Sequence, residues 1–275
     1  MRTPRFSTDL CASRDLYKKG KKLFDMKILV HGISGHMGRE VAELCERGYR
    51  GAELSLGVDR AEGSFGDSPI YAGFSCIPES CEIDCIVDFS HHTAVASLLD
   101  FARERGIPTV VATTGHTDEE LAQIRAAAED IAVFHSANMS LGVALLVELA
   151  KTAAAAMPEA EIEIIEKHHN RKLDAPSGTA LLIADEIKSV REQTRYVYGR
   201  SGHAKRTPDE IGIHAIRMGN VVGDHEVIVA TDSQTITLKH EAHSRALFAE
   251  GSVAAAKFLC GKPAGRYDMK SMLAE

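Results

Sequence analysis

The chain has 275 residues, of which 44% are hydrophobic and 26% are charged, and this length allows one large or two ordinary globular domains. Its net charge of −7 argues against a nucleic acid or an anionic membrane surface as a partner, and no apolar run reaches the roughly 20 residues that cross a bilayer. The six cysteines form no disulfide framework and fit no common zinc site, which predicts reduced thiols in a cytoplasmic protein without a bound metal.

The first 25 residues differ from the rest of the chain. They carry seven lysines and arginines against three aspartates, and they lack the apolar core of a secretion signal. We expect residues 1–25 to be a disordered basic extension or a mis-annotated start, with Met26 as the functional start. An organelle transit peptide is the less favoured alternative.

A short apolar strand at residues 27–30 leads into a glycine-rich turn and then into a helical pattern at residues 39–48. The glycines Gly32, Gly35 and Gly38 are spaced G-x-x-G-x-x-G, a variant of the dinucleotide fingerprint. The first would allow the tight turn, the second the approach of a pyrophosphate, and the third close packing of the helix. The strand before and the helix after favour this interpretation over an ordinary turn.

The next strand, residues 52–58, ends at Asp59, about 20 residues beyond the last of these glycines. An acid at this distance accepts hydrogen bonds from the adenosine ribose of NAD, and Arg60 could meet the 2′-phosphate of NADP. The pair therefore predicts NADH and/or NADPH as the cofactor. The alternative is that both residues lie in an unremarkable exposed loop.

Strands and helices alternate up to residue 140, after a loop-rich stretch at residues 60–80. Such alternation predicts a Rossmann-type, doubly wound parallel sheet, an α/β fold. The ends of its strands would place the Gly32 turn, Asp59, Ser90 and the hydroxyl-bearing segments 113–114 and 136–139 along one rim. The expected strands are 84–90, 107–112 and 131–134, and the expected helices are 93–105 and 118–128.

The pattern changes after Leu141, where a long apolar helix is followed by strands that short turns separate. We therefore predict a second, α+β domain with a mixed or antiparallel sheet. The expected helices are 143–156, 181–191 and 245–259, and the expected strands are 162–166, 210–218, 226–231 and 234–240.

The stretch from residue 163 to residue 180 combines proton donors with a possible anion site. Seven of its first ten side chains are ionisable, and turn chemistry at residues 174–179 precedes a helical pattern. Ser177 and Thr179 are good cap residues, and the free N–H groups at a helix N-terminus suit a carboxylate. A solvated charged face would be the alternative.

This stretch carries a resemblance to a known family. Residues 166–180 read EKHHNRKLDAPSGTA and match every fixed position of the pattern E-x-H-H-x-x-K-x-D-A-P-S-G-T-A. The chain thus resembles dihydrodipicolinate reductase, also called 4-hydroxy-tetrahydrodipicolinate reductase, of diaminopimelate and lysine biosynthesis. The resemblance begins at Met26 and extends to residues 266–269, and it departs at Ala112, where the family usually has glycine.

The resemblance implies a reduction of a cyclic dicarboxylate by hydride transfer, with His168 as the main proton donor and Lys172 as its assistant. His169 and the main chain at Gly178 and Thr179 are implied to bind the substrate carboxylates. The implied cofactor contacts are Gly32, Ile33, Ser34, Gly35, His36, Met37, Asp59, Arg60, Ala112, Thr113, Thr114, Ser136, Ala137, Asn138 and Met139.

The resemblance also implies a domain plan and an assembly. Residues 26–140 with 246–275 would form the dinucleotide-binding domain, and residues 141–245 would form the substrate-binding and tetramerisation domain of a homotetramer. Two other functions remain open from the residues alone. One is another two-domain NAD(P)-dependent dehydrogenase, and the other is a non-catalytic NAD(P)H-sensing protein.

Overall fold

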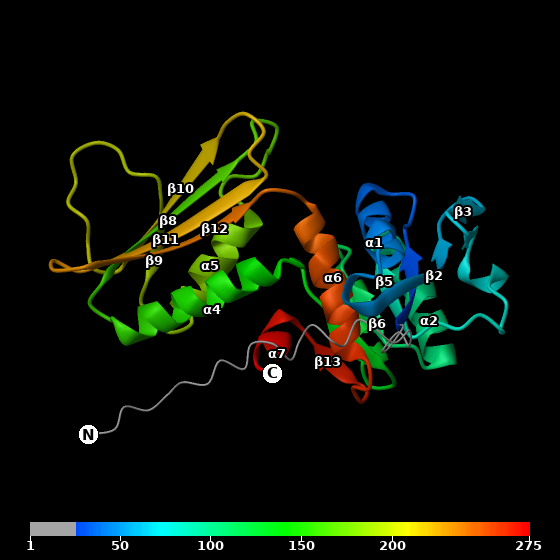
Figure 1. The fold of residues 1–275 in the computed structure, drawn as a ribbon. Coiled ribbons are helices and arrows are strands. Elements are labelled where there is room, and N and C mark those ends of the chain that lie inside the picture. The colour runs from blue at the N-terminus through cyan, green and yellow to red at the C-terminus, as the bar shows by residue number, and fades with distance from the viewer. Residues whose placement is uncertain (1–25) are drawn as a thin grey trace, which may run out of the picture.

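Two sheets lie side by side in the computed structural model, which describes residues 26–275 (Figure 1). The helix α6 (Ala246–Leu259) runs back from the second sheet to the first. The expectation for residues 1–25 lies outside the described residues. Among residues 26–275 no helix is long and apolar enough to cross a membrane.

The first sheet has eight strands in the order β13-β7-β6-β5-β1-β2-β4-β3. All neighbours are parallel except β3 and β4, which pair antiparallel. The chain moves outward from β1 first to one side and then to the other, which is the reversal that creates a ligand crevice in a doubly wound sheet. The bounds are β1 (Met26–His31), β2 (Ala52–Val58), β3 (Gly63–Phe65), β4 (Ser68–Tyr71), β5 (Cys85–Asp88), β6 (Thr109–Val111), β7 (Ala132–His135) and β13 (Gly265–Tyr267).

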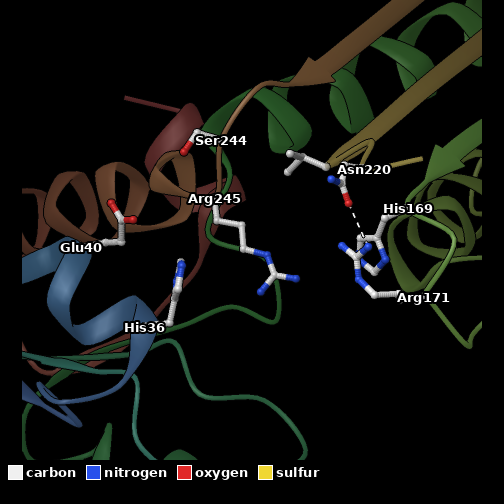
Figure 2. A pocket seen from close by; sticks show the side chains of 8 residues that line it. His36, Glu40, His169, Arg171, Asn220, Ser244 and Arg245 are labelled. Carbon is white, nitrogen blue, oxygen red and sulfur yellow. Dashed lines mark hydrogen bonds between the residues drawn. The ribbon is translucent and has the colours of Figure 1, made fainter. Parts of the chain in front are cut away.

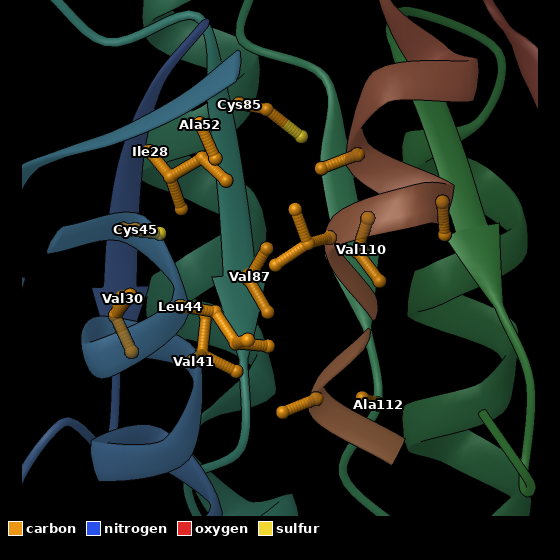
Figure 3. Close-up of a cluster of buried hydrophobic side chains, with 14 of the residues drawn as sticks. Ile28, Val30, Val41, Leu44, Cys45, Ala52, Cys85, Val87, Val110 and Ala112 are labelled. Atoms are coloured by element: carbon orange, nitrogen blue, oxygen red, sulfur yellow. The ribbon is translucent and has the colours of Figure 1, made fainter. Parts of the chain in front are cut away.

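Helices cover both faces of this sheet, so its strands are apolar on both sides. Ile28 and Val30 of β1 pack in the cluster formed with α1 (His36–Glu46) and α6, while Leu29 packs in the cluster under α2 (Val95–Arg105) and α3 (Asp118–Ala127). Figure 3 shows the first of these clusters between the strands and the helices. The predicted Rossmann-type fold class is confirmed, and the short helix α7 (Met269–Leu273) ends the chain.

The second sheet has the order β12-β11-β8-β10-β9 and is mixed, since β8 is parallel to β10 and antiparallel to β11. The helices α4 (Leu141–Ala156) and α5 (Gly178–Lys188) cover one of its faces and bury an aliphatic core. The bounds are β8 (Glu161–His168), β9 (Arg195–Tyr198), β10 (Glu210–Arg217), β11 (Gly223–Ala230) and β12 (Thr235–Ala242).

The alternation of side chains along β8 decides where its polar residues lie. Ile162 and Ile164 face the helices and are almost fully buried, and the period of two places Glu166 and His168 on the same face. Glu166 is 0% exposed. A carboxylate so deep in the protein requires partners, and the site described below supplies them.

Several elements differ from those expected. Residues 60–80 hold the hairpin of β3 and β4, and neither β9 nor β13 was expected. These strands have three or four residues, too few for an alternating pattern to emerge. The short connection after β10 also joins strands that are not neighbours, because β8 lies between β10 and β11.

The return of α6 puts buried residues such as Ala249, Val253 and Leu259 into the core of the first sheet. The assignment of residues 246–275 to the dinucleotide-binding domain, and the domain boundaries at residues 140 and 245, stay a prediction.

At two positions of the fingerprint turn there is a steric reason why the residue is glycine. Gly32 has a φ of 79°, and a Cβ atom there would lie 2.7 Å from the Phe89 carbonyl oxygen. A Cβ atom on Gly38, inside α1, would lie 2.1 Å from the Gly32 carbonyl oxygen. The helix therefore packs directly on the turn only because residue 38 is glycine.

Substitution of Gly38 by alanine tests this close approach. The backbone of the turn would have to move, so we expect Gly38→Ala to lower the free energy of unfolding by about 2 kcal/mol or more in urea denaturation. Gly73→Ala is the control, because its Cβ atom would meet nothing within 4 Å, and it should change that free energy by less than about 0.5 kcal/mol. Equal losses in the two variants would contradict this explanation.

Candidate functional site

The glycine-rich turn holds an ionised carboxylate at the end of β2. Asp59 accepts hydrogen bonds from the backbone N–H of Ser34, at 2.8 Å, and of Arg60, at 2.7 Å. Burial raises the pKa of Asp59, but the donors at Arg60 and Ser34 outweigh it, so that pKa lies below its ordinary value. The Arg60 side chain is exposed beside this carboxylate. The arrangement fits a ribose hydroxyl at the acid, with the arginine free for a phosphate.

A cavity of about 380 Å³ lies over the carboxyl ends of β1, β5 and β6. Near its floor Asp88 is 1% exposed, and one carboxylate oxygen accepts from the Ser90 hydroxyl at 2.6 Å and lies 2.8 Å from Nδ1 of His31. The lining residues are His36, Met37, Phe89, Ser90, His91, His92, Ala112, Thr113 and Thr114.

Two of the expected cofactor residues have side chains that point elsewhere. Ile33 is 0% exposed and Met139 is 2% exposed, and both belong to the core between the first sheet and its helices. Any contact that these two residues make with a cofactor would therefore use the main chain.

The buried carboxylate of Glu166 lies at the centre of the second site. Arg217 of β10 donates to both oxygens, at 2.7 and 2.8 Å, and the Ser177 backbone N–H donates to one of them at 2.9 Å. Nδ1 of His168 donates to the other at 2.6 Å. Burial raises the pKa of Glu166, but these donors, with His168 first, lower it to about 2. The carboxylate is therefore ionised at neutral pH and fixes the imidazole of His168.

The other nitrogen of His168 is kept clear of neighbouring side chains. A Cβ atom on Gly223 would lie 3.0 Å from Nε2 of His168, so the glycine leaves that edge of the ring free. The ring of His225 meets His168 edge to face, with centroids 5.1 Å apart. Burial, and then the charge at His168, lowers the pKa of His225 to about 4, so this second imidazole is neutral at pH 7.

The N-terminus of α5 lies where the sequence predicts an anion cradle. Ser177 is the N-cap, since its hydroxyl accepts from the backbone N–H of Ala180 at 3.2 Å, and its oxygen lies 3.1 Å from Nε2 of His225. In the described part of the chain, the N–H groups of Gly178 and Thr179 have no acceptor. These two donors at the positive end of a helix suit a carboxylate. The helix begins at Gly178, three residues earlier than expected.

A cavity of about 730 Å³ separates this cradle from the first domain. Asn138, after β7, spans the two sides, because its Nδ2 donates to the Thr179 hydroxyl at 3.1 Å. Lys172 enters the cavity with its ammonium 2.8 Å from Asp174. The predicted residues that meet here are Met37, Ala137, Asn138, His168, His169, Lys172, Gly178 and Thr179.

Arg217 and His225 are the functional residues that sequence reasoning missed. Arg217 lies 51 positions from Glu166 in the chain, and only the pairing of β8 with β10 brings the two together. His225 is opposite Glu166 in the pairing of β8 with β11. The signal that could have found a partner was the alternation of β8, which places a glutamate on a buried face.

Comparison with known proteins gives matches along the whole described chain. Residues 26–139 match the family described as dihydrodipicolinate reductase, N-terminus, and residues 142–273 match its C-terminus. The 4-hydroxy-tetrahydrodipicolinate reductase of Clostridium tetani is 44% identical over 250 residues, which cover 90% of this chain and 97% of that protein. The protein of the same name from Caldanaerobacter subterraneus is 45% identical, over 90% of this chain and 98% of that protein.

Two solved structures of known proteins superpose on this fold. A dipicolinate-bound dihydrodipicolinate reductase from Paenisporosarcina sp. TG-14 superposes with a TM-score of 0.77 at 24% identity, over 89% of this chain and 98% of that one. A myo-inositol dehydrogenase from Corynebacterium glutamicum superposes with a TM-score of 0.54 at 15% identity, over 91% of this chain and 93% of that one. At these identities the likeness concerns the fold alone.

Replacement of Glu166 by glutamine tests the role of its charge in stability. The carboxyl has a folded-state pKa of about 2 against an ordinary 4.5. Its lowered pKa contributes about 3 kcal/mol, present above the ordinary pKa and lost as the pH falls toward 2. We expect Glu166→Gln to lower the free energy of unfolding at pH 7 by about 3 kcal/mol and to flatten its decline between about pH 5 and 3, measured by urea denaturation.

Glu129→Gln provides the control for this measurement, since Glu129 is exposed. The Glu129→Gln variant should keep the wild-type free energy of unfolding at pH 7 and the wild-type decline of that free energy in acid. A Glu166→Gln protein with an unchanged acid decline would show that this carboxylate is not the group that titrates.

Proposed function

The chain belongs to the dihydrodipicolinate reductase family, and we propose that His168 donates the proton when it reduces 4-hydroxy-tetrahydrodipicolinate to tetrahydrodipicolinate. This is the reductase step of diaminopimelate and lysine biosynthesis. NADH or NADPH, when bound, supplies the hydride. The observation that carries the proposal is the cavity in which His168, Lys172 and the α5 cradle face residues of the first domain.

The residues of the fingerprint turn fit a dinucleotide. Gly35 is the N-cap of α1, and a Cβ atom there would lie 3.2 Å from the Gly32 carbonyl oxygen, so a larger residue would crowd the turn at the helix end that would hold a diphosphate. Asp59 would hold the adenosine ribose, and Arg60 would meet a 2′-phosphate where one is present. The segments 112–114 and 136–139 would flank the nicotinamide with small and hydroxyl-bearing side chains.

Proton donation would take place at Nε2 of His168. The hydrogen bond from Nδ1 to Glu166 keeps a proton on that nitrogen, so Nε2 is the atom that would pass a proton to the substrate. Arg217 and Ser177 hold the carboxylate in place, which fixes the plane of the imidazole. Lys172 would add a second cation beside the reacting bond and assist the transfer.

The cradle would position the substrate by its carboxylates. The N–H groups of Gly178 and Thr179 would donate to one carboxylate, and His169 would face it from the loop after β8. Asn138 holds the Thr179 hydroxyl, so the cradle keeps a defined distance from the segment after β7. Such fixed donors fit a dianionic substrate better than a sugar or an aldehyde, and family membership argues against a non-catalytic sensor.

We further propose that the open face of the second sheet joins four copies of the chain, in the cytoplasm. No helix of residues 26–275 packs on this face, and Ile216 of β10, which lies on it, is 39% exposed. An exposed apolar side chain on a broad, uncovered sheet face suits an interface between copies. Charged side chains in the same region pair with one another, since Glu163 meets both His214 and Arg206.

The native mass tests this assembly. We expect sedimentation equilibrium to give four times the chain mass of 29.8 kDa. Because the interface would be apolar, Ile216→Asp should dissociate the tetramer, and Val190→Asp, at the same 39% exposure in the turn after α5, should not. A monomeric wild-type protein would rule the proposal out.

The absorbance of NADH or NADPH at 340 nm tests the reaction and its proton donors together. The purified protein should oxidise NADH or NADPH when the product of dihydrodipicolinate synthase is added. His168→Gln and Lys172→Ala should each lower kcat by about 10²–10⁴-fold, the usual contribution of a positioned acid, while the Kd of NADH stays close to that of the wild type.

His203→Gln and Lys205→Ala are matched controls, because both side chains are exposed in the loop between β9 and β10. They should keep the wild-type kcat. Absence of oxidation by the wild type would remove the proposed reaction, and full turnover in both site variants would remove the assigned donors.

A further inference from the structure

We infer that Arg171, supported by Arg245, reaches across the cleft from the second domain and binds the diphosphate of the dinucleotide. The inference rests on the proposed function, which supplies the dinucleotide, and it adds a cofactor-binding role to residues outside the fingerprint. Arg171 lies in the loop after β8, and Arg245 precedes the first turn of α6.

The two arginines line a cavity of about 520 Å³ between the domains. Figure 2 shows His36 and Arg245 on the side of α1 and α6, and His169 and Arg171 facing them from the second domain. The complete lining is His36, Glu40, His169, Arg171, Asn220, Val222, Ser244 and Arg245. Four of these side chains are basic and one is acidic.

The two guanidinium groups of this cavity are not neutralised by direct pairing, although Glu40 supplies one carboxylate to the lining. Within residues 26–275 neither guanidinium forms an ion pair, whereas Arg195, Arg206 and Arg217 each meet a carboxylate. Arg171 donates instead to neutral amide oxygens, at 2.8 Å to Asn220 and at 3.4 Å to Asn170. Unpaired guanidinium groups that converge on one hollow suit a multiply charged anion.

The titration of His169 is consistent with this field. Burial lowers the pKa of His169, and the positive charges of Arg171 and Arg245 lower it further. A bound anion would offset that repulsion, so the cavity is electrostatically incomplete without one.

The position of α1 identifies the anion. His36 is the first residue of α1, and the N-cap Gly35 provides no side-chain acceptor, so the N–H groups of the first turn are available. The diphosphate of a dinucleotide binds at this helix end in a doubly wound fold. The arginines therefore face that diphosphate from the opposite wall.

The substrate carboxylates are the alternative anion that these arginines could bind. The residues that line the two cavities distinguish between the two alternatives. The larger cavity holds the α5 cradle with Gly178 and Thr179, and Arg245 and His169 line both cavities. Arg171 lines the smaller cavity and not the larger one. Arg171 is therefore the diagnostic residue, and its bond to Asn220 holds the guanidinium in place before the anion arrives.

Equilibrium binding without substrate tests the inference. We expect Arg171→Met to raise the Kd of NADH and of NADPH about tenfold or more, as titration calorimetry would measure it, because one charge-assisted contact is lost. The dependence of log Kd on log salt should become less steep in the variant, since fewer charges are neutralised on binding. Pyridine-2,6-dicarboxylate (dipicolinate) is the probe for the substrate cradle, and its Kd should remain within about twofold of the wild-type value.

Arg47→Met is the matched control, because Arg47 follows α1 on the surface and pairs with Glu43 rather than with the cleft. It should leave all three dissociation constants unchanged. Arg171→Lys should recover part of the affinity, since it keeps the charge and loses the two-pronged geometry.

Three results would overturn the inference. The Kd values of NADH and NADPH could be unchanged in Arg171→Met, the variant could weaken only pyridine-2,6-dicarboxylate, or the wild type could bind neither dinucleotide. Failure of the proposed function is a separate outcome. It would show as a wild type that binds dinucleotide normally but does not oxidise it when the substrate is added.

Discussion

One buried carboxylate determines the geometry of the second domain's site. Glu166 faces the core because β8 alternates, and burial without partners would be prohibitively unfavourable. Its two oxygens are therefore fully engaged by Arg217, Ser177 and His168. Through these bonds one side chain orients the imidazole, anchors the turn before α5 and joins β8 to β10. His168 and the N-terminus of α5 thus share a single support.

The two charged regions of the cleft follow opposite rules. Around Glu166 each charge meets its partner, so the arrangement is rigid in the absence of a ligand. Around Arg171 and Arg245 the partners are missing within the described chain, so the free energy gained by pairing is left for an anion that arrives from outside. Rigid positioning suits a group that must deliver a proton to one atom, and an unneutralised surface suits a group that must attract a charged ligand.

Much of the fold could be predicted because local rules agree with the tertiary structure. The strand expected at residues 52–58 is β2 (Ala52–Val58), and the G-x-x-G-x-x-G spacing coincides with the turn between β1 and α1. The motif at residues 166–180 pointed to the cradle, since Ser177 and Gly178 have the chemistry of a helix start. The hairpin of β3 and β4 could not be predicted, because such short edge strands are formed by pairing rather than by their own pattern. Arg217 and His225 were missed for a related reason, since strand register and not sequence distance makes them neighbours of Glu166.

The path of the chain explains how two sheets can share one site. If the chain ended after β12, only the segment before α4 would connect the second domain to the first. Instead α6 returns and buries Ala249 and Val253 in the first core, so two segments cross between the domains. Two crossings restrain the second domain more than one would, and the bond from Asn138 to Thr179 also links the walls of the larger cavity, so the two halves of the site are held opposite each other.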